Sequence, residues 1–147
     1  MCHGHGMLLV AATCWERLRA ARHGVLGTVH ASRGVDAVPV VFVVHGDQDR
    51  GQIVIPIDTV KAKAGGRLQR LRNLDADQRA VLLVEHYDED WSQLWWVRVH
   101  GHAHEAVPSS EQLERLAGGF PAYAVPGTVT SVILLEPDEI SGWSEGP

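Results

Sequence analysis

Residues 53–73, IVIPIDTVKAKAGGRLQRLRN, decide how the rest of this 147-residue chain is interpreted. The stretch opens with an apolar run dominated by β-branched side chains, which predicts a buried strand that Pro56 and Asp58 bring to a close. Lys61 and Lys63 follow on a turn that contains two consecutive glycines. The chain is therefore expected to pass from a buried strand into a positively charged turn.

A basic helix is predicted directly after this turn. Leu68, Leu71 and Leu74 recur at helical spacing and lie near one face, while Arg67 and Arg70 lie elsewhere on the helix surface. The dipole and free N–H groups of a helix N-terminus attract anions, and lysine side chains add point charges that bind phosphate. The strand end, the turn and the helix together predict an anion-binding site. A solvated basic face without a ligand is the alternative.

The composition predicts one domain of ordinary globular type. The chain carries a formal net charge of -5 with 45% hydrophobic residues, so general nucleic-acid binding is not expected and the basic cluster is a local feature. Its 2 cysteines provide no disulfide framework, which favours a cytoplasmic location. No apolar run approaches the roughly 18 residues of a membrane span. Residues 1–12 are interpreted as a variable tail and residues 13–147 as a single domain.

Turn signals and hydrophobic periodicity predict a mainly β fold. Six strands are expected, at residues 25–30, 37–44, 53–57, 79–84, 94–105 and 128–136. Short helices are expected at residues 14–22 and 67–74 and between 110 and 117, with capping-box spacing at the start of the first and the third. The fifth strand is expected to be the longest and to kink at Gly101, and Pro39 predicts an edge or a bulge in the second. Mostly short hairpin connections favour a six-stranded antiparallel barrel, closed or split, with short flanking helices.

The order and spacing of several segments carry a family resemblance. These segments are GVLGTV at 24–29, PVVF at 39–42, IPID at 55–58 with the two lysines, LQRLRNL at 68–74, DEDW at 88–91 with 95–101, and the tail at 134–143. Together they resemble the split β-barrel flavin and deazaflavin oxidoreductases related to pyridoxamine 5'-phosphate oxidase, and within them the branch that uses the deazaflavin coenzyme F420. The resemblance implies the split-barrel fold of the FMN-binding type and a homodimer with two cofactor sites at its interface.

The resemblance also implies which residues hold the cofactor. Its phosphate would be held by the basic turn, at Lys61 and Lys63. Its ring system would be lined by two strand segments, which are Pro39, Val40 and Val41 on one side and Ile55, Pro56, Ile57 and Asp58 on the other. Trp91 would reach the ring from the partner subunit.

Two further residues are added on charge and position alone. F420 carries an acidic oligoglutamate tail, and Arg67 and Arg70 lie close enough in sequence to the lysine turn to contact it. No dedicated catalytic residue is assigned. Tyr87, Tyr123 and His86 are the side chains nominated as proton donors.

The resulting hypothesis is an F420-dependent oxidoreductase that transfers a hydride to an electron-poor small molecule such as an enone, a quinone or a conjugated tetrapyrrole. One alternative is an FMN-dependent enzyme of the pyridoxamine 5'-phosphate oxidase type that uses the same lysines. A second alternative, from a different class, is a non-catalytic F420 carrier, because no catalytic dyad is visible.

Other clusters are interpreted without a ligand. His100, His102 and His104 alternate on one strand and share a face, but three positions along one strand do not close a tetrahedral metal shell. They are predicted to be an exposed histidine ladder, and no metal site is assigned. The acidic residues 88–90 are predicted to form a solvated turn. The Cys2, His3 and His5 group near the N-terminus is expected to bind metal only adventitiously.

Overall fold

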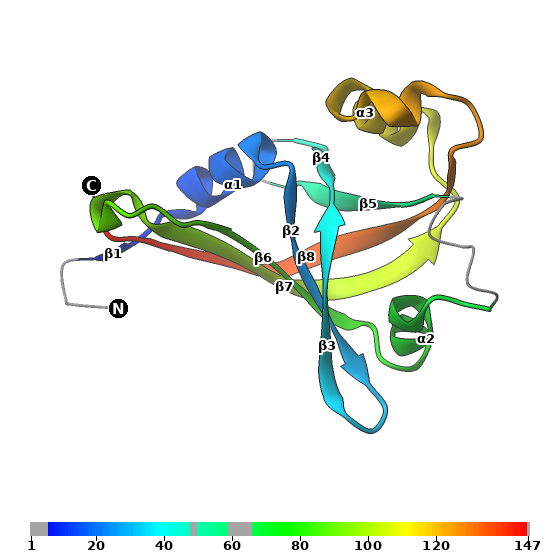
Figure 1. Cartoon of the computed structure of the whole chain (residues 1–147), viewed down its shortest axis with the longest axis horizontal. Helices are drawn as coiled ribbons and strands as arrows, with labels where there is room; N and C mark the ends of the chain where they lie inside the picture. The colour runs from blue at the N-terminus through cyan, green and yellow to red at the C-terminus, as the bar shows by residue number, and fades with distance from the viewer. Residues whose placement is uncertain (1–5, 48–49, 59–65, 147) are drawn as a thin grey trace.

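The computed structural model describes residues 6–47, 50–58 and 66–146 (Figure 1). Within these residues, eight strands form one antiparallel sheet in the order β3-β2-β6-β7-β8-β5-β4, with β1 paired to β8. Their bounds are β1 Met7–Leu8, β2 His23–His30, β3 Gly34–Val41, β4 Val43–His45, β5 Gln52–Asp58, β6 Arg79–His86, β7 Trp95–Ala106 and β8 Val129–Ser144. The helices are α1 Ala11–Ala20, α2 Gln69–Ala76 and α3 Ser110–Gly119, with 3-10 turns η2 Trp91–Gln93 and η3 Pro121–Ala124. None of the helices in the described ranges is long and apolar enough to cross a membrane.

The sheet closes into a barrel through the run that contains β3 and β4. β3 pairs with β2 and β4 pairs with β5, and the two strands are separated only by Phe42. Phe42 is buried in the core, and its N–H donates to the carbonyl of Arg22 at 3.3 Å. The run 34–45 therefore joins both ends of the sheet, and with β2, β6, β7, β8 and β5 it makes a six-membered ring. The predicted antiparallel split barrel with short helices is confirmed, and the strand expected at 37–44 is divided at Phe42.

Strand β5 is buried on both faces. Ile53, Ile55 and Ile57 point into the barrel core, whereas Val54 packs in a second cluster with Leu116 of α3. This explains why the sequence shows a continuous apolar run rather than an alternating pattern. In Figure 1, α3 lies above β5, whereas α2 lies at the lower right, below the ends of β5 and β7.

The helix boundaries show which local signals decide a helix start. The predicted capping box at the third helix is confirmed, because the hydroxyl of Ser109 accepts from the N–H of Gln112 at 3.1 Å and the Gln112 side chain accepts from the N–H of Ser109. The one predicted for the first helix is wrong, since α1 begins at Ala11 and its N-cap, Val10, makes no side-chain hydrogen bond. Burial of an apolar face, including Leu18, sets that helix instead.

The two longest strands carry the predicted kink. β8, with 16 residues, is longer than β7, with 12, so the expectation that the fifth strand is longest is wrong. The pairing of β7 with β8 shifts register between His100 and Gly101. A Cβ atom at Gly101 would lie 2.1 Å from the carbonyl oxygen of Glu136, so the close approach requires glycine.

The outer face of β3, β2 and β6 is apolar. Pro39, Val25 and Leu83 lie opposite one another across the three strands, and β3 is an edge strand, as its proline predicts. Val25 and Leu83 are 39% and 37% exposed, and Val35 near the start of β3 is 69% exposed. A sheet face that is apolar on the outside as well as the inside is typical of a surface that another chain covers.

We predict that Gly101→Ala destabilises the fold by about 1–3 kcal/mol, because the new methyl group overlaps backbone rather than a flexible side chain. The free energy of unfolding in urea measures the effect. Gly118→Ala is the matched control, since a Cβ there meets nothing within 4 Å and alanine is the better helix former, so that variant should be as stable as the wild type or slightly more stable. Equal stability of the two variants would contradict the close approach at the bulge.

Candidate functional site

A buried polar cluster forms where β5 ends. Asp58 is only 8% exposed and directly follows a register shift in the pairing of β5 with β8. The hydroxyl of Tyr123, on η3, donates to Oδ2 of Asp58 at 3.2 Å. Burial raises the pKa of the Tyr123 phenol, and the charge of Asp58 and this hydrogen bond raise it further. The carboxylate therefore holds Tyr123 in its neutral, proton-bearing form.

Arg70 brings a positive charge to the same cluster from α2. Burial lowers the pKa of its guanidinium, and the charge of Asp58 opposes that effect. Its Nε atom is buried and has no hydrogen-bond partner among the residues that the structure describes. A buried donor without an acceptor is costly, so an anionic ligand here would supply the missing acceptor. This is a correction in part to the sequence-based prediction, which placed Arg70 on the helix surface.

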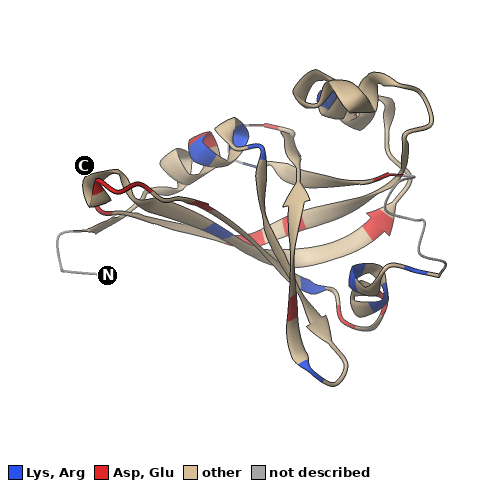
Figure 2. Cartoon of the chain, viewed as in Figure 1, with Lys and Arg blue, Asp and Glu red and all other residues tan. Residues whose placement is uncertain are grey.

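Arg67 is occupied by carboxylates of the protein itself. Its Nε and Nη2 donate to Asp75 at 2.8 and 3.0 Å, and its Nη1 donates to Glu105 at 2.9 Å. Hydrogen bonds to Asp75 and then to Glu105 raise the pKa of this guanidinium. Glu105 also accepts from the hydroxyl of Ser131 at 2.7 Å. The contacts fix the start of α2 to the ends of β7 and β8, and Figure 2 shows basic positions on α2 beside acidic positions at neighbouring strand ends.

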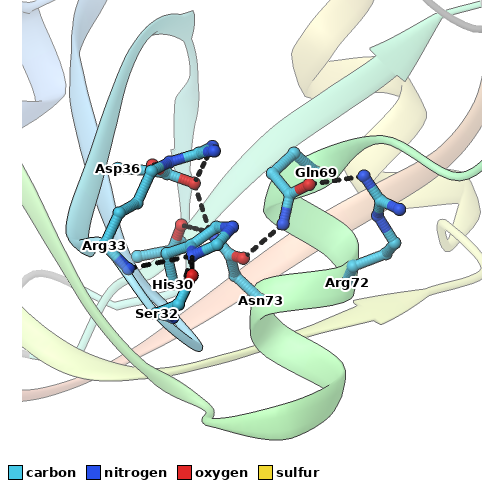
Figure 3. A network of polar contacts seen from close by, with 8 residues as sticks. His30, Ser32, Arg33, Asp36, Gln69, Arg72 and Asn73 are labelled. Atoms are coloured by element: carbon cyan, nitrogen blue, oxygen red, sulfur yellow. Dashed lines mark hydrogen bonds and ion pairs between the residues drawn. The ribbon is translucent and has the colours of Figure 1, made fainter.

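Helix α2 is also anchored to the β2–β3 hairpin by a buried amide (Figure 3). Asn73 is 3% exposed, and its Nδ2 donates to the hydroxyl of Thr28 and to Oδ2 of Asp36, both at 2.9 Å. Gln69, one turn earlier on α2, donates to Oδ1 of Asn73 at 2.8 Å. Arg33 holds Asp36 from the other side with bonds of 2.7 and 3.0 Å. This network sets the position of α2, and hence of Arg70, relative to the barrel.

Strand β3 places the predicted ring-lining residues at the sheet edge. Val40 points into the core and Pro39 is exposed on the outer face. Val41, the last residue of the strand, is half-buried. On β5 the side chains of Ile55 and Ile57 are in the core, and Pro56 is buried as well. What β5 offers near its end is therefore its backbone and Asp58, rather than these apolar side chains.

Trp91 lies at the opposite end of the barrel from the Asp58 cluster. Ala106, at one end of β7, pairs with Val132 of β8, which also pairs with Pro56 near the end of β5. Trp95, at the other end of β7, lies just after the turn η2, which begins at Trp91. The 12 residues of β7 span about 40 Å at roughly 3.3 Å per residue. One chain therefore does not bring its own Trp91 to its own Asp58. The predicted phosphate ligands Lys61 and Lys63 lie outside the described residues.

The histidine ladder, the acidic turn and the N-terminal Cys/His group remain to be placed. His100, His102 and His104 are all exposed on the outer face of β7, as predicted, and no group of three or more His, Cys, Asp or Glu side chains within the described ranges is placed to hold a metal ion. The acidic turn is organised by its own carboxylates. Asp90 accepts from the N–H and the hydroxyl of Ser92 at 3.1 and 2.7 Å. The Cys2, His3 and His5 group lies outside the described residues.

Sequence reasoning missed the role of Asn73 and the convergence of Arg70 with Asp58. A buried amide within a basic helix gives no periodic signal, because only the fold shows that Asn73 faces a hairpin more than thirty residues away. Tyr123 was nominated only as a proton donor. Its pairing with Asp58 depends on where α3 and η3 pack, which no local pattern specifies.

Comparison with known proteins adds a family. The sequence model described as "pyridoxamine 5'-phosphate oxidase" matches residues 11–144. None of the curated proteins matches.

Solved structures share the fold. A conserved protein of unknown function from Corynebacterium diphtheriae is 17% identical, with a TM-score of 0.64 and coverage of 95% of this chain and 97% of its own. An FAD-binding protein from Mycobacterium smegmatis is 17% identical, with a TM-score of 0.59 and coverage of 94% and 96%. A conserved hypothetical protein from Mycobacterium tuberculosis is 18% identical, with a TM-score of 0.69 and coverage of 93% and 86%.

We predict that Asp36→Asn lowers stability most at neutral pH. Hydrogen bonds from Arg33 and then from Asn73 lower the pKa of Asp36 to about 2, whereas an unfolded aspartate titrates near about 3.9. The carboxylate therefore stabilises the fold above pH of about 4 and loses that contribution as the pH falls toward about 2. The difference in unfolding free energy between wild type and variant should narrow over this interval. Glu89→Gln, in the exposed acidic turn, is the control, and a difference for Asp36→Asn that stays constant with pH would refute the assignment.

Proposed function

Because this chain belongs to the pyridoxamine 5'-phosphate oxidase family, we propose that it is a cytoplasmic, homodimeric oxidoreductase that transfers a hydride from reduced F420 to an electron-poor small molecule. The observation that supports the proposal is the cluster at the end of β5, where the buried Nε of Arg70, near the charge of Asp58, has no acceptor among the described residues. An anionic group of a cofactor would accept a hydrogen bond from this Nε atom of Arg70.

The proposed cofactor grip combines the lysine turn with α2. Lys61 and Lys63 lie three and five residues after Asp58 in the sequence, and the charge of Asp58 acts on Arg70 of α2. Lysine and arginine side chains are the usual partners of phosphate groups. Arg70 would hold the phosphate or the first carboxylate of the oligoglutamate tail. Arg67 would contact the tail only by exchanging its bonds to Asp75 and Glu105.

The rest of the proposed site positions the ring and a proton. When bound, F420 supplies the hydride chemistry, and the protein supplies position and exclusion of water. The backbone of Pro39, Val40 and Val41 at the sheet edge would line one side, and the end of β5 would line the other. Tyr123 keeps its proton at neutral pH because of burial and the Asp58 charge, so it is the proton donor that we propose. It would have to release its hydrogen bond to Asp58 before it could protonate the acceptor.

The homodimer is proposed from the outer surface of the barrel. Val25, Val35, Leu83 and Pro39 form an apolar outer face on β2, β3 and β6, which a second copy would cover. The distance along β7 between Trp91 and the Asp58 cluster supports the further proposal that Trp91 serves the site of the partner subunit.

A flavin is the second candidate cofactor. One solved structure with this fold is an FAD-binding protein from Mycobacterium smegmatis and another is an FAD-binding protein from Mesorhizobium loti. An FMN-dependent oxidase would use the same cationic strand end. A non-catalytic F420 carrier would use it too, and it would differ by binding the cofactor tightly without turning over any acceptor.

A fluorescence titration of the purified protein with F420, beside FMN and FAD, tests the cofactor. We expect micromolar or tighter binding of F420 and weak flavin binding, and we expect Lys63→Ala and Arg70→Ala each to weaken F420 binding by about tenfold, the value of one charge-assisted contact. Arg72→Ala is the matched control, because Arg72 is exposed on α2 and its side chain bonds to Gln69 of the same helix. Preference for FMN or FAD would assign the flavin oxidase function instead, and unchanged F420 affinity in both variants would refute the proposed phosphate grip.

We predict that Leu83→Asp converts the dimer into a monomer, because a desolvated carboxylate at the centre of the apolar face is costly. Sedimentation velocity measures the oligomeric state. Val107→Asp, at a position that is 89% exposed and away from the three strands, is the control and should remain dimeric. A wild-type protein that sediments as a monomer, or a dimer that survives Leu83→Asp, would show that this face is not the interface.

A further inference from the structure

A second cationic cleft lies between α1, β4 and α3, on the side of the barrel away from α2 (Figure 1). Its volume is about 280 Å³. Three arginines line it, Arg19 and Arg22 from the end of α1 and Arg115 from α3. Its apolar wall includes Val43 and Phe120. Figure 2 shows basic positions on both helices.

Within the described ranges, the hydrogen bonds of the three guanidinium groups all go to neutral backbone carbonyls. Arg19 donates to Gly46 at 3.2 Å and to Asp47, Arg22 donates to Gly119, and Arg115 donates to Val44 at 3.3 Å.

No described carboxylate forms an ion pair with any of the three. By contrast, Arg33, Arg67 and Arg79 each pair with an aspartate or glutamate. In a chain of net charge -5, three arginines around one cleft without an ion-pair partner among the described residues are a local exception.

Capping of helix ends does not account for all three side chains. Arg22 bonds to the last residue of α3, which is the ordinary role of a basic side chain at a helix C-terminus. Arg115 reaches a strand carbonyl instead, and Nε of Arg19 is buried without a hydrogen-bond partner in the part of the chain that the structure describes. Like charges that converge on one cavity repel each other. An anion between them would offset that repulsion and accept hydrogen bonds from their N–H groups.

The apolar wall adds a second requirement for the ligand. The guanidinium of Arg22 lies over the ring of Phe120, 5.0 Å from its centroid, and Phe120 makes an edge contact with Tyr123 at 5.8 Å. These contacts fix the cation and the ring against each other, so an anionic group and an apolar group are offered side by side.

We propose that this cleft binds the phosphate or carboxylate group of a small organic anion whose apolar part lies against Phe120 and Val43. The site is separate from the cluster at the end of β5, and the proposal stands whether or not the chain binds F420. Its arginines come from α1, from the connection between α1 and β2, and from α3, which is far away in sequence, so it exists only in the folded chain.

Isothermal titration calorimetry of the full chain without cofactor tests the proposal. The probes are phenyl phosphate and benzoate, with neutral benzamide as the uncharged analogue. We expect at least one anion to bind at least about tenfold more tightly than benzamide, and we expect Arg22→Gln and Arg115→Gln each to weaken that binding by about tenfold. Preference for phenyl phosphate assigns a phosphate ligand, and preference for benzoate assigns a carboxylate.

The matched control is Arg98→Gln, because Arg98 lies on the outer face of β7 over Trp96 and does not line the cleft. Its anion affinity should equal that of the wild type. Arg115→Gln keeps the test valid if Arg22→Gln does not fold, since Arg115 is exposed and makes a single backbone contact. Binding of neither anion, equal binding of benzamide, or anion binding that survives Arg115→Gln would overturn the proposal.

Discussion

The burial of β5 on both faces is the constraint on which the rest of the structure depends. Ile53, Ile55 and Ile57 fill the barrel core, and Val54 lies under α3, so the strand has no freedom to rotate or slide. Because β5 is fixed, Asp58 is held at its end, where it accepts from Tyr123 of η3 and acts on the charge of Arg70 of α2. The candidate cofactor cluster is thus a consequence of core packing rather than of the loops around it.

Four arginines of this chain fall into two groups that differ in how the protein pairs their guanidinium groups. Arg33 and Arg67 are held by bidentate bonds to aspartates, and these pairs fasten the β2–β3 hairpin and α2. Arg70 and Arg19 instead keep a buried Nε without a partner within the described ranges. A guanidinium that the protein leaves unpaired is the kind that an anionic ligand stabilises. We propose that arginine serves the fold in the first group and anion recognition in the second.

Sequence patterns predicted what local forces decide and missed what tertiary packing decides. The continuous apolar run of β5, the edge position of Pro39 and the capping box at Ser109 were all predicted, because each follows from side-chain chemistry within a few residues. The start of α1 was not, since burial overrides its capping signal. Segments that are distant in sequence form both the cluster of Asp58, Arg70 and Tyr123 and the cleft between α1 and α3. Hydrophobic periodicity within one segment does not predict contacts of this kind.

The break at Phe42 also bears on how the barrel assembles. One continuous run provides the partner of β2 on one side and of β5 on the other, so the β2–β3 and β4–β5 hairpins share a chain segment. Both are local pairings that form at low entropic cost, whereas β2 with β6 and β5 with β8 join residues far apart in the chain. Folding is therefore expected to begin at the two hairpins on either side of Phe42. The long-range strands would then add to these two hairpins, which the buried Phe42 joins.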